Sequence, residues 1–240
     1  MSNQTFVDKW NDIWTVSMDI CGIGHITARV LNNGNAEVLL KLDAVWNGLN
    51  TDRPENAESR IWTESIIEFV DADKFLWCSY TSKEGTHGVK DTPFDMFYDG
   101  ETRVTPLANG LSIRNSRGTT ILPLVGPGPV VPDIQLPLYA CTRKPDKSAN
   151  WPLQSLGFWR NEQGRAWHLL PLNLRYAGRK GPQTGLNHAF EADLPEEIGR
   201  TFSVWTDEKG NFMGMGDEQE VQIVADDEET ARALLAARSD

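Results

Sequence analysis

Apolar and polar residues alternate along much of this chain. Alternation runs from Trp14 to Ile20, continues through residues 26–30, and then extends over the eleven residues from Ala36 to Trp46. A period of two is typical of strands that bury one face, because successive side chains point to opposite sides of a sheet. The turn sequence Asn-Asn-Gly-Asn at residues 32–35 separates the last two runs. These runs therefore predict an antiparallel hairpin.

Short apolar runs separated by turn residues recur through the rest of the chain. Clusters of Asp, Asn and Gly punctuate them every eight to twelve residues or so. Spacing of this kind indicates an antiparallel sandwich or barrel, here of about a dozen strands. Beyond the first hairpin, the predicted strands include residues 61–70, 75–80, 96–98, 103–104, 111–114, 158–159, 167–169, 202–205 and 212–213.

The two ends of the chain show helical spacing instead. Near the start, Thr5 can cap a short helix whose apolar face includes Phe6 and Trp10. Near the end, four acidic residues at 226–229 precede an apolar face that includes Leu234, an order that the helix dipole favours. We therefore expect a mainly β protein: an antiparallel β-sandwich or β-barrel with a short N-terminal helix and a C-terminal helix.

The length of 240 residues, with 40% hydrophobic residues, suits a single domain spanning residues 1–240. The amino terminus has scattered charges and does not resemble a secretory signal, and no apolar run has the roughly 18 residues of a membrane helix. We expect a soluble, cytoplasmic protein without membrane contact. Its net charge of −11 also argues against nucleic acid as a partner.

Charge is distributed unevenly along this acidic chain. Residues 103–190 carry 11 basic and 3 acidic groups, whereas residues 1–102 carry 8 and 17, and residues 191–240 carry 4 and 14. The basic middle either pairs with the acidic flanks within the fold or forms a patch for an anionic ligand or an acidic partner.

The stretch from Gly118 to Pro132 is the most unusual segment of the sequence. Its fifteen residues contain no charge but include four prolines and three glycines. It is too apolar for a solvated linker and too rich in proline for a central strand. Long segments of this kind in compact domains are typical of lids, binding walls or contact arms.

Familiar catalytic and metal motifs are missing from the sequence. The three cysteines lie almost sixty residues apart, and no two of the four histidines have the spacing of metal ligands on one element. There is no GxSxG nucleophile motif, no dinucleotide fingerprint and no phosphate-binding loop. We expect buried, reduced cysteines, no metal and no cofactor.

Two groups of residues are candidates for chemistry. The segment at 86–98 brings His87, Asp91 and Tyr98 close together in sequence, and these three are the proton-transfer candidates. The nine tryptophans fall mostly in predicted strands and favour an aromatic core or an aromatic-lined cavity. The candidates for ligand binding are the ring-bearing residues Trp159, His168 and Tyr139 and, for an anionic group, Arg143, Arg175 and Arg179.

The leading functional hypothesis combines these features. It is the binding of a small, partly apolar, anionic organic molecule in an aromatic-lined β cavity, with cofactor-free acid/base conversion of the lyase, isomerase or hydrolase type as the reaction. A first alternative is a structural subunit of a homo-oligomer that uses residues 118–137 as a contact arm. A second is a carbohydrate-binding protein or glycosidase, because tryptophans are frequent and because Glu64 and Glu68 lie on one face of a predicted strand.

Overall fold

The structure is a computed structural model that describes residues 2–17, 22–46, 59–87, 100–161, 164–180, 187–193, 201–216 and 221–237. The chain forms two compact units. Unit 1 comprises Met1–Ile121 and Val224–Asp240, and unit 2 comprises Leu122–Ile223.

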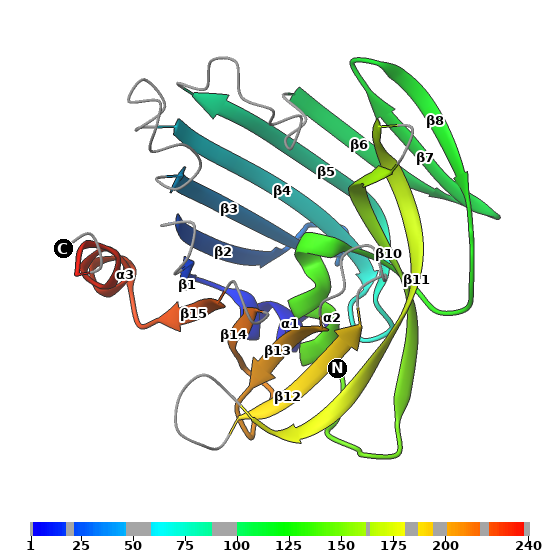
Figure 1. Cartoon of the computed structure of the whole chain (residues 1–240). Helices are drawn as coiled ribbons and strands as arrows, with labels where there is room; N and C mark the ends of the chain where they lie inside the picture. The colour runs from blue at the N-terminus through cyan, green and yellow to red at the C-terminus, as the bar shows by residue number, and fades with distance from the viewer. Residues whose placement is uncertain are drawn as a thin grey trace. The chain divides into compact units, whose positions relative to one another are not determined.

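Unit 1 contains a sheet in which each strand lies beside its neighbours in sequence, in the order β8-β7-β6-β5-β4-β3-β2-β1 (Figure 1). The pairs from β1–β2 to β6–β7 are antiparallel. Such a meander follows directly from successive hairpins. The strands are β1 (Ile13–Ser17), β2 (Gly22–Val30), β3 (Ala36–Trp46), β4 (Ser59–Asp71), β5 (Leu76–His87), β6 (Gly100–Leu107), β7 (Gly110–Asn115) and β8 (Gly118–Pro123).

The short N-terminal helix α1 (Asn3–Trp10) packs against β2 and β3. Its buried face includes Phe6, whose ring lies 5.3 Å from Phe69, and Phe69 in turn lies 4.9 Å from Phe75, both pairs edge to face. The N-cap is Ser2, whose hydroxyl accepts a hydrogen bond from the Thr5 amide. The helix was therefore correctly predicted, but Thr5 as its cap was wrong.

Asn3 connects the start of α1 to two hairpin turns. Its side-chain amide donates to the main-chain oxygens of Gly34 and Val70, at 3.0 and 3.2 Å, and its oxygen accepts from the amide of Ala72 at 3.1 Å. Gly34 lies in the β2–β3 turn and Ala72 in the β4–β5 turn. One carboxamide thus holds the helix and both turns together.

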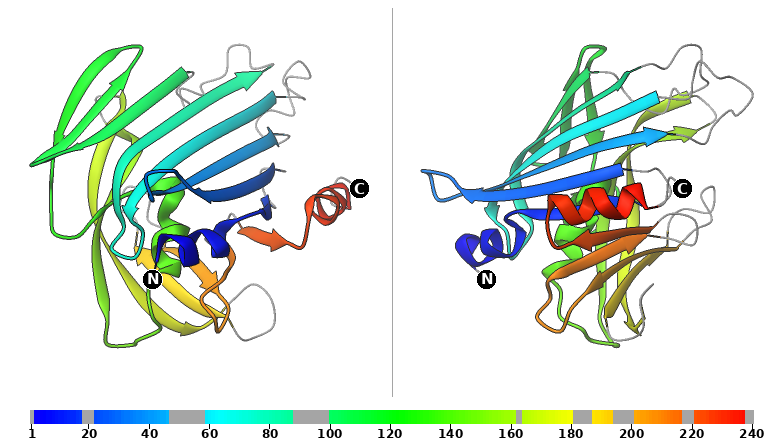
Figure 2. Two further views of the ribbon diagram at one scale, coloured as in Figure 1. Left: turned by 180° about the vertical axis from the view of Figure 1, so that it is seen from behind. Right: turned by 90° about the vertical axis from the view of Figure 1, so that its left-hand side faces the viewer.

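The C-terminal helix α3 (Glu228–Ala236) packs against β1 and β2 of the same unit (Figure 2). Its N-cap is Asp227, whose carboxylate accepts from the Thr230 amide at 2.7 Å. Within the helix, Ala231 is fully buried. The expectation of a capped C-terminal helix that packs on a sheet is confirmed. Among the described helices, α1 and α3 included, none is long and apolar enough to span a membrane.

Unit 2 contains strands in the order β9-β10-β11-β12-β13-β14-β15. Strand β9 is parallel to β10, and the later pairs are antiparallel. The strands are β9 (Val130–Pro132), β10 (Asn150–Asn161), β11 (Gly164–Arg179), β12 (His188–Asp193), β13 (Thr201–Thr206), β14 (Phe212–Gly216) and β15 (Val221–Ala225).

A six-residue helix, α2 (Leu136–Cys141), is buried along its whole length. It follows the 3-10 turn η2 (Asp133–Gln135) and contacts β9, β13 and β14. Its sequence, LPLYAC, is apolar on every side, as expected for a helix that no solvent reaches. The sequence pattern did not predict this helix, because a helix without a polar face has no amphipathic period.

The uncharged stretch at 118–132 supplies two short strands and a bend between them. The side chain of Gln154, 1% exposed, holds the bend: its Oε1 accepts from the amides of Val125 and Gly126 at 2.8 and 3.2 Å, and its Nε2 donates to the Gly128 oxygen at 3.1 Å. Gly128 has φ +90, and a Cβ there would lie 2.0 Å from the Pro152 oxygen. This part of the stretch is therefore fixed against β10.

The predicted fold class is confirmed: the protein is mainly β, with a short helix near each end. Proline in the 118–132 stretch also fits its position, because β8 and β9 each lie at an end of a strand order. The single domain at 1–240 stays a prediction.

Candidate functional site

Four ring side chains gather on unit 2. Trp151 of β10 lies 5.8 Å from Phe190 of β12, and Tyr176 of β11 lies 5.6 Å from Phe190 and 5.5 Å from His188, measured between ring centroids. All three pairs are tilted by about 50°. Phe190 is buried, whereas the other three rings are half-buried. We call these four residues the ring cluster.

Strand register creates the ring cluster. Tyr176 and Phe190 are direct cross-strand partners, and Trp151 is the partner of Leu174, two residues before Tyr176. Residues two apart on a strand, and partners across a ladder, share one face of a sheet. Aromatic pairs in such positions stabilise a sheet and leave flat apolar surface between them.

The ring cluster has one polar edge. The Tyr176 hydroxyl and His188 Nδ1 lie 2.8 Å apart and form a hydrogen bond whose donor depends on the imidazole tautomer. A bulge between Tyr176 and Gly178 shifts the register, so that Arg179 becomes the cross-strand partner of His188. The Tyr176 phenol and the His188 imidazole therefore lie at this edge, with Arg179 as the next cross-strand residue.

The cations of β11 interact with carboxylates from the acidic segment that follows. Arg175 forms ion pairs with Asp193 and, at 3.1 Å, with Glu191. Arg179 contacts Glu208 at 3.1 Å. Hydrogen bonding from Arg175 lowers the pKa of the Asp193 carboxyl. Part of the basic middle of the sequence therefore pairs with its acidic flank, which was one of the two interpretations of the charge pattern.

Tyr139 and Arg143 also come together. The Arg143 guanidinium lies over the Tyr139 ring, 4.6 Å from its centroid, and donates two hydrogen bonds to the Thr142 hydroxyl. Tyr139 is only 3% exposed, and burial raises the pKa of its phenol while the Arg143 charge opposes that rise. In this position Tyr139 fixes the end of α2.

The other predicted ligand-binding residues lie on the β10–β11 hairpin. His168 is half-buried on β11 opposite Gly157. Trp159 pairs through its main chain with Ala166, but its side chain lies outside the described part of the structure. All six predicted ligand-binding residues belong to unit 2.

The predicted proton-transfer residues fall mostly outside the described residues. Asp91 and Tyr98 lie in the gap between residues 87 and 100. His87 ends β5, where its main chain pairs with Arg60, and its side chain lies outside the described part. Their role stays a prediction.

Glu64 and Glu68, the pair behind the glycosidase alternative, each hold other groups. Glu64 forms ion pairs with Lys41 at 3.4 Å and Lys83 at 3.9 Å. Glu68 accepts from Asn35 at 2.7 Å, and this hydrogen bond is the main cause that lowers the pKa of its carboxyl. Four residues along a strand separate the two main-chain positions by about 13 Å, more than the roughly 5 to 9.5 Å between the carboxyls of a glycosidase pair, so this arrangement gives no support to the glycosidase alternative.

The predicted site residues include none of the four rings of the cluster. No strand was predicted between residues 169 and 202, whereas β11 continues to Arg179 and β12 begins at His188. The alternation of Leu172, Leu174 and Tyr176 was a usable signal for the longer strand.

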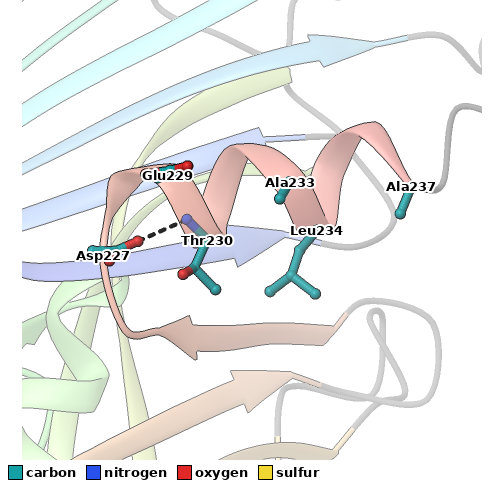
Figure 3. A pocket seen from close by; sticks show the side chains of 6 residues that line it. All are labelled: Asp227, Glu229, Thr230, Ala233, Leu234 and Ala237. Atoms are coloured by element: carbon teal, nitrogen blue, oxygen red, sulfur yellow. Dashed lines mark hydrogen bonds between the residues drawn. The ribbon is translucent and has the colours of Figure 1, made fainter.

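Other site types find little support among the described residues. No group of three or more His, Cys, Asp or Glu in that part of the chain could hold a metal ion. An open hollow of about 400 Å³ runs along α3, where the Asp227 carboxylate already caps the helix (Figure 3). Its lining residues are Asp227, Glu229, Thr230, Ala233, Leu234 and Ala237, all from α3 and its cap.

Comparison with known proteins gives a likeness of fold. No family model matches the sequence, and no curated protein matches it significantly. Among solved structures, the chain is similar to a beta-barrel-like protein of the domain of unknown function DUF1849 from Brucella abortus, at 8% identity and a TM-score of 0.51. The match covers 89% of this chain and 93% of that one. At such low identity the likeness concerns the fold alone: this chain has a fold similar to that of a β-barrel-like protein.

Proposed function

We propose that unit 2 binds a small, partly apolar organic anion at the ring cluster. The observation that carries this proposal is the hydrogen bond between Tyr176 and His188 at the edge of half-buried rings, with Arg179 as the next cross-strand residue. Binding sites for small molecules commonly combine aromatic walls with a few convergent polar groups.

The chemistry of the ring cluster limits the ligand. Trp151 and Tyr176 offer apolar ring faces, which favour a ligand with a flat or aliphatic body. Arg179 offers a planar cation suited to a carboxylate. Binding a ligand there would break its exposed ion pair with Glu208, and exposed ion pairs of that kind contribute little to stability. A carboxylated ring or short acyl chain meets both requirements.

Calorimetric titration of the full chain with indole-3-acetate, benzoate and octanoate tests the proposal, with the neutral amide of each as its comparison. The acids should bind more tightly than their amides. Tyr176→Phe removes one hydrogen-bonding group and should weaken binding about fivefold, from a net value of about 1 kcal/mol per hydrogen bond. No binding of any acid, or equal binding of acids and amides, would overturn the proposal.

His25 offers a matched control in unit 1. It too is a half-buried imidazole, stacked on Trp14 at 4.0 Å between ring centroids and hydrogen-bonded to Asp12 at 2.8 Å. His188→Gln should reduce binding of the acids, whereas His25→Gln should leave binding unchanged. Equal losses in both variants would point to general destabilisation.

Cofactor-free acid/base conversion of such an anion is the finer part of the proposal. His87, Asp91 and Tyr98 are the candidates for proton transfer, supported by their grouping in one thirteen-residue segment. Arg143 and Arg175 would assist Arg179 in orienting an anionic substrate. Replacing each proton-transfer candidate by an isosteric inactive residue should abolish turnover with little change in melting temperature, and three active variants would disprove this chemistry.

A further inference from the structure

Strand β8 is an end strand with little protection against further pairing. No described strand pairs with its outer edge. Five of its six residues are exposed, and Ile121 is 58% exposed. An edge of this kind presents unpaired N–H and C=O groups, which proteins usually shield with charges, bulges or proline. The sequence GTTILP has no charged residue, and its proline stands at the last position.

Strand β7, which is next to β8, and strand β6 beyond it carry a local excess of positive charge. Arg103 of β6 and Arg114 of β7 are direct cross-strand partners and both are exposed. Like charges placed opposite each other destabilise a sheet. Glu101 forms an ion pair with Arg103, but within the described residues no carboxylate pairs with Arg114. Arg117, in the β7–β8 turn, adds a third exposed arginine.

We propose that the edge of β8 binds an acidic, extended segment of another protein as an added strand. Main-chain hydrogen bonds to β8 would provide affinity, as in other cases of strand addition. The added strand would lie about 10 Å from β7, twice the usual strand spacing. Side chains of glutamate and Arg114 can bridge that distance across the uncharged β8. Arg114 then gains a carboxylate partner, which it lacks among the described residues.

Charge favours such a partner over a second copy of this chain. Two β8 edges paired with each other would join two uncharged strands and place the two arginine-bearing β7 strands about 14 Å apart, with no acidic group on the strands between them. An acidic segment instead complements Arg103, Arg114 and Arg117. The segment should alternate acidic residues with apolar ones, because an added strand presents one row of side chains to each face of the sheet.

The test uses the full chain and a fluorescein-labelled ten-residue peptide of alternating glutamate and valine, with binding followed by fluorescence anisotropy. The acidic peptide should bind, and its affinity should fall as salt is raised. A lysine–valine peptide, and the acidic peptide with every amide N-methylated, should both bind at least tenfold more weakly. Equal binding of the lysine peptide refutes the charge argument, and equal binding of the methylated peptide refutes strand addition.

Variants locate the binding surface. Arg114→Gln should weaken binding of the acidic peptide about fivefold, the scale of one exposed ion pair. Arg29→Gln is the matched control, because Arg29 is an exposed arginine on β2 of the same unit and should have no effect. Circular dichroism checks that both variants fold. Equal effects in the two variants overturn the proposal, as does sedimentation of the protein as a dimer that Ile121→Lys dissociates.

Discussion

Gln154 provides the sharpest test of how the uncharged stretch is held in place. Its buried side chain makes three hydrogen bonds to the main chain of residues 125–128. At a net value of about 1 kcal/mol each, Gln154→Leu should lower the free energy of unfolding by ~3 kcal/mol. For a chain of this length that corresponds to a fall in melting temperature of about 6 to 12 °C.

Urea unfolding, followed by tryptophan fluorescence and by circular dichroism, measures the loss of stability. Asn173→Leu is a matched control, because Asn173 is an exposed carboxamide on the neighbouring strand β11. That change should alter stability by less than about 0.5 kcal/mol. The reasoning fails if Gln154→Leu lowers the free energy of unfolding by less than about 1 kcal/mol, since the amides of residues 125 and 126 would then have found other partners.

Three further predictions follow from the same kind of reasoning. Gly128→Ala places a Cβ 2.0 Å from a main-chain oxygen of β10 at a residue with positive φ, so it should lower the free energy of unfolding in urea by more than about 3 kcal/mol. Gly126→Ala is its control: the nearest atom to a Cβ there is 3.6 Å away, and stability should hardly change. Arg175→Gln should lower the free energy of unfolding by less than about 1 kcal/mol at neutral pH. Because the pKa of Asp193 is lowered in the folded state, its ion pair with Arg175 stabilises the protein fully above the unfolded-state pKa and is lost as pH falls. The difference in unfolding free energy between Arg175→Gln and the wild type should therefore shrink below about pH 4. A difference that stays constant with pH contradicts this reasoning. Phe6→Ala should cost about 3 to 5 kcal/mol by thermal unfolding, and a smaller loss would mean that α1 is loosely packed.

The strand pattern was the most predictable part of this fold. The alternating run at 36–46 forms β3 with the predicted ends, and the turn at 32–35 joins it to β2. Such predictions succeed because the sequence of each strand alone shows the two-residue period. The prediction of α2 failed because a fully buried six-residue helix has no polar face to mark it.

The ring cluster depended on information that no single segment contains. Trp151 and Phe190 lie 39 positions apart in the sequence and meet because β10, β11 and β12 pair in one particular register. The bulge after Tyr176 then decides that Arg179 and no other residue faces His188. Local propensity fixes neither the register nor the bulge. Two of the three predicted arginines, Arg175 and Arg179, therefore lie on β11 beside the cluster, while none of its four rings was among the predicted site residues.

The hydrogen bonds of Asn3 have a consequence for the order of folding. They connect residues 31 to 69 positions apart, so they can form only after both hairpin turns exist. A helix of eight residues is unstable alone in water. Helix α1 should therefore be among the last elements to become ordered, and Asn3→Ala should speed unfolding much more than it slows folding. In this protein, α1 becomes ordered after the hairpins have formed, and its contacts then slow the unfolding of the sheet.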